Sequence, residues 1–233
     1  MQIVNRVPVA NSLLAALPRK ECQYLIDDLK RVELTYGEVL NESGEQIKYV
    51  YFPYDSVVSL LTLVDQHQTL GVGLVGHEGM VGFPLAFEIP ISPVRALVQG
   101  TGMAMRMKAK PFLKKLRQSQ ALQRELYHYT YSLMTQITQT AACHRFHDVE
   151  ARLARWLLMT HDRKQSSPFR LTQEFLSHML GVRRVGITMA AGTLQRDKLI
   201  SYSHGNITIL DRKGLKAAAC SCYKIIEDMH DGA

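Results

Sequence analysis

Two adjacent arginines in the C-terminal third of the chain have the chemistry needed to contact DNA bases. Arg183 and Arg184 begin a segment that predicts a helix, and Arg196 lies near its end. A guanidinium can donate two parallel hydrogen bonds to O6 and N7 of guanine, the commonest specific base contact. Val185 and Met189 lie on the outward face of the same segment, where apolar side chains can contact thymine methyl groups. These residue types at this spacing indicate contact with a major groove.

Polar residues around this segment are candidates for contacts with the DNA backbone. Such contacts position a protein on the duplex without specifying a sequence. They are expected from the start of the preceding helix, from the helix itself and from a following turn. The complete set of expected DNA-binding residues is Thr172, Gln173, Arg183, Arg184, Val185, Thr188, Met189, Arg196 and His204.

The elements that must position these side chains lie within residues 171–209, which predict a helix, a tight turn, a second helix and a small hairpin. Thr172 suits an N-cap and Gly181 suits the turn. The second helix is predicted from about Arg183 to Asp197, and four of its apolar residues have the spacing 0, 3, 4, 7 that faces a core. These four are Ile187, Ala190, Ala191 and Leu194. This order is that of a winged helix-turn-helix, which places its second helix in a DNA groove.

Two glycines interrupt the second predicted helix. Gly186 and Gly192 each cost about 1 kcal/mol of helix propensity. Their presence indicates a close backbone approach, either to DNA or to a neighbouring helix.

Charge also favours an anionic partner. The 233 residues carry a formal net charge of +7, and residues 163–216 alone hold ten basic and three acidic residues. A basic surface of this kind is typical of nucleic-acid binding, and a merely solvated surface is the alternative. A separate basic run is interpreted as a solvated face, with RNA polymerase or DNA contact as the alternative. Its members are Arg106, Lys108, Lys110, Lys114, Lys115 and Arg117.

The first half of the chain predicts many short strands. Residues 57–64 and 69–75 predict one hairpin, and Arg95–Gln99 with Met103–Met107 predict another around Gly100-Thr101-Gly102. Strands at this spacing favour a sandwich, roll or barrel.

A long helix follows the strands, since no glycine or proline occurs from Ser119 to Ala142. Apolar residues recur along it at spacings of four and three, as in a helix pair. We interpret the stripe as the seam of a homodimer, with packing on the chain's own β domain as the alternative. The seam residues are Leu122, Leu126, Tyr129, Leu133 and Ile137.

Four cysteines, no secretory signal and no long apolar run favour a reducing cytoplasm. We interpret Cys220 and Cys222 as ordinary helix cysteines, with a metal or redox role as the alternative; no metal is expected.

Three stretches resemble the Crp/Fnr family of bacterial transcription regulators, and the resemblance extends over nearly the full chain. Gly37-Glu38-x-Leu40 with Phe52-Pro53 resembles the start of the family's cyclic-nucleotide-binding-type β-roll. Phe146 to Val149 resembles its hinge, and Gly181 to Ile200 resembles its recognition segment.

The resemblance implies an α+β chain in two domains. Residues 1–145 would form an antiparallel, jelly-roll-like β-roll with flanking helices and a dimerisation helix at about 112–143. Residues 146–233 would form a winged helix-turn-helix domain. A homodimer would then bind a two-fold-related site on double-stranded DNA.

The resemblance also locates the residues that determine specificity. Arg184 falls where the family's principal base-contacting arginine lies. Val185 replaces a glutamate that many members carry, and Met189 replaces a second arginine of the cyclic-AMP-responsive members. We therefore expect an operator different from the cyclic-AMP type.

The effector pocket implied by the resemblance comprises Gly82, Phe83, Arg95 and Ala96. Phe83 stands where the ribose-binding glutamate would be. Arg95 lies one position from the phosphate-binding arginine, and one step along a strand reverses the side-chain face. Cyclic AMP is not the expected effector, and no iron–sulfur cluster is expected because the N-terminal cysteine cluster of the oxygen-sensing members is absent.

Two other functions compete with DNA binding. One is a ligand-sensing or protein-docking module whose winged helix binds a protein. The other, an enzyme, is not expected: Asp148 and Asp162, near three histidines, would lie about 21 Å apart along a helix.

Overall fold

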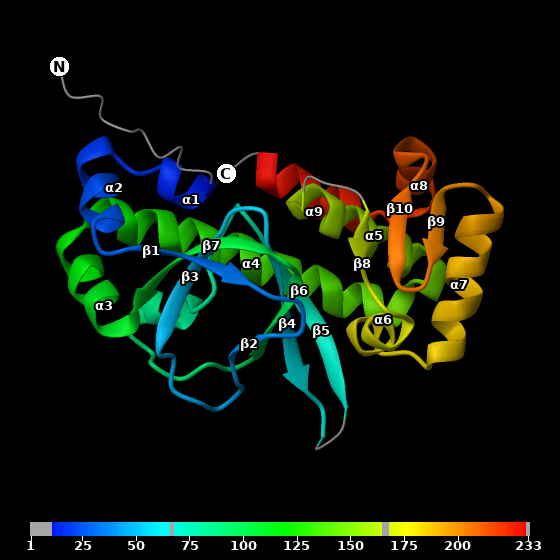
Figure 1. The fold of residues 1–233 in the computed structure, drawn as a ribbon, viewed down its shortest axis with the longest axis horizontal. Helices are drawn as coiled ribbons and strands as arrows, with labels where there is room; N and C mark the ends of the chain where they lie inside the picture. Colours follow the sequence, from blue (N-terminus) through cyan, green and yellow to red (C-terminus); the bar gives the residue numbers. More distant parts are fainter. Residues whose placement is uncertain (1–10, 66–67, 165–167, 232–233) are drawn as a thin grey trace.

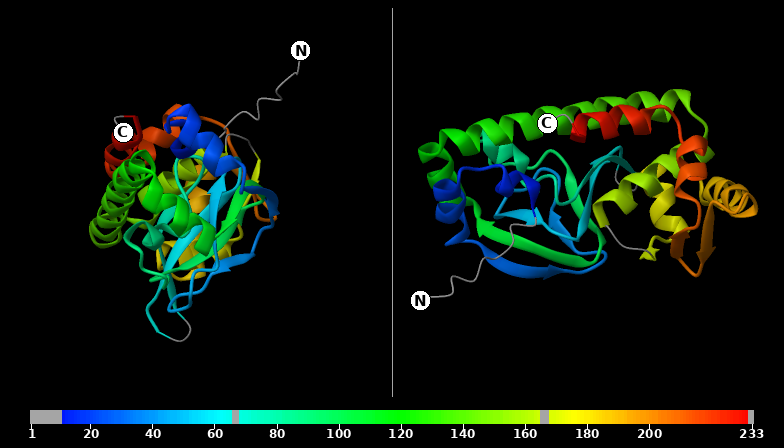
Figure 2. Two further views of the ribbon diagram at one scale, coloured as in Figure 1. Left: turned by 90° about the vertical axis from the view of Figure 1, so that its left-hand side faces the viewer. Right: turned by 90° about the horizontal axis from the view of Figure 1, so that it is seen from above.

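The computed structural model describes residues 11–65, 68–164 and 168–231. A β domain lies at one end and a helical module at the other, and one long helix runs along both (Figures 1 and 2). The predicted α+β fold class is confirmed. No helix in the described ranges is both long and apolar enough to cross a membrane.

Two antiparallel sheets and a few short helices make up the β domain. One sheet has the strand order β1-β7-β3 and the other has the order β2-β6-β4-β5. The strands are β1 (Lys30–Leu34), β2 (Val39–Asn41), β3 (Tyr49–Pro53), β4 (Val57–Leu63), β5 (Thr69–Val75), β6 (Arg95–Gly100) and β7 (Gly102–Lys108). The helices are α1 (Ser12–Ala15), α2 (Arg19–Ile26) and the 3-10 helix η1 (Phe83–Phe87).

One of the two predicted hairpins is confirmed and the other is wrong. β4 and β5 pair antiparallel, with Leu63 opposite Thr69. β6 and β7 are consecutive but belong to different sheets. The reason is a close crossing at Gly102, where a Cβ atom would lie 2.6 Å from the backbone nitrogen of Ser56. The glycines therefore let the chain cross between sheets rather than turn back on itself.

The helix predicted at about 112–143 is divided in two. α3 (Ala109–Gln118) ends at Ser119, whose backbone is extended (φ −122°, ψ 103°). The Ser119 side chain accepts a hydrogen bond from the backbone nitrogen of Leu122 and so caps α4 (Gln120–Phe146). The long uninterrupted helix is therefore present, but it starts at residue 120.

The predicted dimer seam is wrong, because its residues are buried within their own chain. The stripe packs against the β domain, where Leu122 and Leu126 have no exposed surface. Tyr129 donates a hydrogen bond to the carbonyl oxygen of Met80 (3.0 Å). Four of the five predicted seam residues are buried: Leu122, Leu126, Tyr129 and Leu133. The fifth, Ile137, is half-buried against the same core. These residues therefore pack on the chain's own β domain, which was the alternative interpretation of the stripe.

The C-terminal module begins after α4. His147 is extended, and the Asp148 carboxylate accepts a hydrogen bond from the Ala151 amide at the start of the next helix (2.8 Å). Its helices are α5 (Val149–Lys164), α6 (Gln173–Leu180), α7 (Arg184–Arg196), α8 (Arg212–Ala218) and α9 (Cys222–Asp231). Its strands are β8 (Phe169–Arg170), β9 (Ile200–Ser203) and β10 (Asn206–Ile209), in the order β8-β10-β9.

Buried contacts join the module to the β domain. Val57, Leu61 and Leu74 of the β domain pack in one core with the module's apolar residues. Gln99 of β6 donates to the hydroxyl of Thr160 (2.7 Å) and accepts from the indole of Trp156 (3.2 Å). Because this core crosses the α4–α5 break, the division into residues 1–145 and 146–233 stays a prediction.

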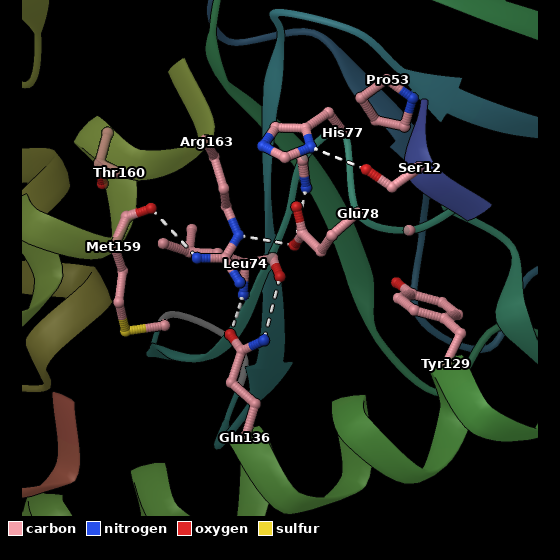
Figure 3. A network of polar contacts seen from close by, with 12 residues as sticks. Ser12, Pro53, Leu74, His77, Glu78, Tyr129, Gln136, Met159, Thr160 and Arg163 are labelled. Carbon is pink, nitrogen blue, oxygen red and sulfur yellow. Dashed lines mark hydrogen bonds and ion pairs between the residues drawn. The ribbon is translucent and has the colours of Figure 1, made fainter. Parts of the chain in front are cut away.

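A buried ion pair strengthens the same junction. Arg163 Nε of α5 lies 2.7 Å from a carboxylate oxygen of Glu78, and both side chains are largely buried. Nearby, the Gln136 side chain on α4 bonds both backbone groups of Leu74 on β5 (2.6 and 3.2 Å), as Figure 3 shows. The module, the sheet and the long helix are therefore fixed to one another by polar contacts as well as by apolar burial.

The junction predicts opposite outcomes for two glycines of β5. A Cβ on Gly71 would lie 2.8 Å from the backbone oxygen of Met179 on α6, whereas a Cβ on Gly73 meets nothing closer than 3.5 Å. Gly71→Ala should lower the free energy of unfolding by about 1–3 kcal/mol through overpacking. The matched control Gly73→Ala should lower the free energy of unfolding by a smaller amount. Urea unfolding of both variants tests this, and equal losses would contradict the docking of α6 on β5.

Candidate nucleic-acid interface

The turn between α6 and α7 forms as its residue types predict. The Thr172 hydroxyl accepts a hydrogen bond from the Phe175 amide (3.1 Å) and caps α6. Gly181 ends α6 in the left-handed conformation (φ 60°) that favours glycine. Arg183 is the N-cap residue of α7, which ends at Arg196, so the predicted bounds of the second helix are correct to within a residue.

α7 has the two faces that its sequence predicts. Its four core residues, Ile187, Ala190, Ala191 and Leu194, are buried in the module. On the opposite face Val185 is 62% exposed and Met189 is 70% exposed. Large apolar side chains this exposed on a basic helix form a surface that a partner would cover. Thirteen residues give the helix a length of about 20 Å, so it can span a groove.

Four of the predicted residues line one hollow of about 350 Å³ between α6, α7 and the wing formed by β9 and β10. These four are Thr172, Gln173, Arg184 and His204. Thr188 lies beside them, since its hydroxyl oxygen is 2.9 Å from the side-chain oxygen of Gln173 and 3.1 Å from the carbonyl oxygen of Arg184. The hollow therefore combines a guanidinium with hydroxyl, amide and imidazole groups, a set suited to a phosphate group.

Tyr202 also lines this hollow, and sequence reasoning did not single it out. Its hydroxyl donates to the carbonyl of Leu171 (2.9 Å) and joins the wing to the start of α6. Burial raises the pKa of Tyr202 to about 12, so the donor keeps its proton at neutral pH. The signal for it in the sequence was weak, because a tyrosine in a short strand is common in any sheet.

The three arginines are not brought to one place. Arg184 lines the hollow beside the wing, whereas Arg183 lines a different hollow with Val64 and Leu70 of the β4–β5 hairpin. Arg196 lies at the far end of α7. Within the described ranges no carboxylate forms an ion pair with any of the three. Arg184 and Arg196 therefore mark the two ends of an exposed helix, and Arg183 faces the β domain.

The two glycines of α7 are not required by packing inside the chain. A Cβ on Gly192 would have nothing within 4 Å, and one on Gly186 would meet only Val182, at 3.9 Å. Among the described residues a neighbouring helix therefore does not explain them. A close approach of DNA to the helix backbone stays a prediction for both glycines.

The expected effector residues lie in packed surroundings. Gly82 (φ 97°) precedes η1, and Phe83 packs against the core. Ala96 is buried, and Arg95 forms an ion pair with Glu42 (2.8 Å). Arg95 thus already has an anionic partner. Tyr129 fills the space next to Gly79, where a Cβ would lie 2.1 Å from its ring.

The basic run is partly neutralised within the chain. Lys115 is buried and pairs with Asp28 (2.8 Å), and Arg117 pairs with Glu88 (2.6 Å). The hydrogen bond from Arg117 lowers the pKa of the Glu88 carboxyl. Arg106 lies over the ring of Tyr49, 4.5 Å from its centroid. These three residues contact their own domain, and buried Lys115 is not part of a solvated face.

Comparison with known proteins agrees with this geometry. Residues 151–218 match the model of the Crp-like helix-turn-helix domain. No curated protein matches the sequence. Solved structures do match: FixK2 from Bradyrhizobium japonicum has a TM-score of 0.67 and 13% identity, covering 83% of this chain and 98% of its own.

Two further structures have the same fold. A transcriptional regulator of the CRP family from Thermus thermophilus has a TM-score of 0.67 and 16% identity, covering 81% of this chain and 96% of its own. CLP, a c-di-GMP-responsive global regulator from Xanthomonas campestris, has a TM-score of 0.64 and 16% identity, covering 82% and 99%. Residues 151–218 are therefore a Crp-like helix-turn-helix domain, carried by a chain with the fold of the Crp/Fnr transcriptional regulators.

Proposed function

We propose that this protein is a sequence-specific DNA-binding transcriptional regulator that acts as a homodimer. The observation that carries the proposal is the outward face of α7. Exposed Val185 and Met189 lie there between two arginines, which form no ion pair with a carboxylate among the described residues. Arg184 donates to a guanine, and the two apolar side chains contact thymine methyl groups. The hollow lined by Thr172, Gln173 and His204 holds a phosphate of the DNA backbone, and the wing lies along the adjacent DNA strand.

Dimerisation uses a different face of α4 from the one that the sequence predicted. A second stripe on this helix has the spacing 4, 3, 4, 3 of a helix pair and is exposed along its length. Tyr127, Tyr131 and Met134 are 50%, 65% and 57% exposed. The seam residues are Tyr127, Tyr131, Met134, Thr138 and Ala141. Pairing of two α4 helices along this stripe places two α7 helices for a two-fold-related site.

We also propose that cyclic AMP is not the effector. Arg95 is paired with Glu42, so a cyclic phosphate would have to displace a carboxylate. Phe83 offers no acceptor for a ribose hydroxyl, and the Tyr129 ring fills the space between α4 and Gly79. A signal acting on the β domain would therefore differ in chemistry from a cyclic nucleotide bound through Arg95.

Arg184→Ala tests base recognition. In a binding selection the native protein should recover a two-fold-related site with half-sites about one helical turn apart. The variant should lose about 1–3 kcal/mol of binding free energy and relax specificity at one base pair per half-site. The matched control Arg31→Ala removes the same charge from β1 and should leave the preference intact. If the affinity for DNA does not fall as the salt concentration rises, the result would instead support a protein-docking module.

Gly192→Ala separates folding from DNA binding. Because the space around Gly192 is open, alanine should raise the free energy of unfolding by about 0.5–1 kcal/mol through helix propensity. The same methyl should weaken DNA binding if the backbone approaches the duplex there. Gly181→Ala is the contrast, since its positive φ and a Cβ 2.6 Å from Leu70 make it destabilising. A more stable variant with native affinity would refute the close approach.

Tyr131→Glu tests the proposed dimer seam on the exposed stripe of α4. A carboxylate in the centre of the exposed stripe should convert the dimer to a monomer, measured by sedimentation velocity, without loss of the buried α4 contacts. Leu210→Glu is the control, because Leu210 is also exposed (58%) but follows the wing. A dimer that persists in Tyr131→Glu would place the interface elsewhere.

A further inference from the structure

Three cysteines and one histidine from distant parts of the chain meet beside the break between α4 and α5. Cys143 lies in the last turn of α4, and His147 caps the same helix. Cys220 and Cys222 lie at the junction of α8 and α9. The four potential ligand atoms all lie within 4.8 Å of one another, and the three cysteines are buried.

The distances suit a single tetrahedral ion. Cys143 Sγ lies 3.4 Å from Cys220 Sγ, and Cys222 Sγ lies 3.5 Å from Nδ1 of His147. Tetrahedral zinc–sulfur bonds of about 2.3 Å place two sulfurs about 3.8 Å apart. All four cysteines of the chain are free, so the cluster is not a disulfide. An iron–sulfur cluster, which contains several iron atoms, needs a wider cage than these atoms form.

Groups around the four residues match those that support thiolate ligands. Gln139 Nε2 donates to the Cys222 sulfur (3.0 Å). The positive charge of Arg155 lies near both Cys143 and Cys220, and a nearby positive charge stabilises thiolates. Hydrogen bonds to ligand sulfurs orient a metal site and tune its affinity.

Arg155 supplies a positive charge that would balance the negative charge of a metal site. Its side chain is fully buried, and Nη1 donates to the Thr140 hydroxyl (3.1 Å). Nε and Nη2 have no hydrogen-bond partner among the described residues. A buried guanidinium requires a compensating anion. A divalent ion with three thiolates and one neutral imidazole carries a net charge of −1, which balances one arginine.

We propose that Cys143, His147, Cys220 and Cys222 bind one Zn²⁺ ion in a tetrahedral Cys₃His site. Three S–H bonds are replaced by three Zn–S bonds, and the released protons pass to solvent. The ion joins the C-terminal end of α4 to the start of α9, which lies alongside α4 (Figure 2). It therefore restrains the α4–α5 break at the point where α4 ends. This proposal does not depend on DNA binding.

The test uses the full chain, reduced and stripped of metal under anaerobic conditions, and Co²⁺ as the probe. One Co²⁺ per chain should give a thiolate-to-cobalt charge-transfer band and the strong visible absorption of a tetrahedral site, and Zn²⁺ should abolish both. Cys143→Ser and Cys220→Ser should lose the band. The matched control Cys22→Ser, which removes a buried cysteine of the β domain, should keep it.

A measurement on the native chain covers the case in which a variant does not fold. Zn²⁺ should slow alkylation of Cys143, Cys220 and Cys222 and leave the rate at Cys22 unchanged, as followed by peptide mass spectrometry. Absence of the thiolate–cobalt band in the native chain, a band that persists in Cys143→Ser, or equal protection of all four cysteines would overturn the proposal.

Discussion

The packing of α4 on its own β domain determines where the other functional parts of the molecule lie. Four apolar side chains of this helix are buried in the β domain, and two polar contacts fix its rotation. Tyr129 bonds the carbonyl of Met80, and Gln136 bonds both backbone groups of Leu74. With one face of the helix fixed in this way, the opposite face must be exposed. The same rotation directs Cys143 and His147 toward α9.

The module is positioned by a second set of contacts that crosses the chain break at His147. Gln99 joins β6 to α5 through Thr160 and Trp156, and Gly71 permits β5 to approach the backbone of α6. These contacts are buried, so breaking them exposes both apolar surface and polar groups. The orientation of α7 therefore depends on the conformation of β5 and β6.

Local patterns in the sequence predicted the module well. A cap such as Thr172, a glycine with positive φ such as Gly181 and a core stripe such as Ile187 to Leu194 all depend on residues within one turn of one another. The long helix shows the limit of such patterns. Both of its faces carry the spacing of a helix pair, one as Leu122 to Ile137 and the other as Tyr127 to Ala141. Spacing alone cannot tell which face meets the chain's own sheet.

Contacts between distant residues were the other limit. Gly100-Thr101-Gly102 has the composition of a hairpin turn, but the neighbouring loop at Asp55 and Ser56 makes it a crossing between sheets. In the same way, Cys220 and Cys222 have no nearby ligand in the sequence, because Cys143 and His147 lie more than seventy residues earlier. Only the return of α9 along α4 brings the four together.

The helix α5 is thus held near its two ends by interactions of different chemistry. At the C-terminal end of α5 the Arg163–Glu78 ion pair is buried (Figure 3), and separating the two charges would leave each of them uncompensated in the interior. At its N-terminal end the proposed restraint is the cluster of three thiols and one imidazole, whose strength would depend on metal binding and on the oxidation state of the sulfur atoms. Val149 and Arg163 lie about 21 Å apart along α5, so the two restraints act at opposite ends of this helix and loss of one leaves the other in place. Of the two restraints, the thiol cluster has the chemistry that metal supply and oxidation can alter, whereas the ion pair contains neither a metal ligand nor a redox-active atom.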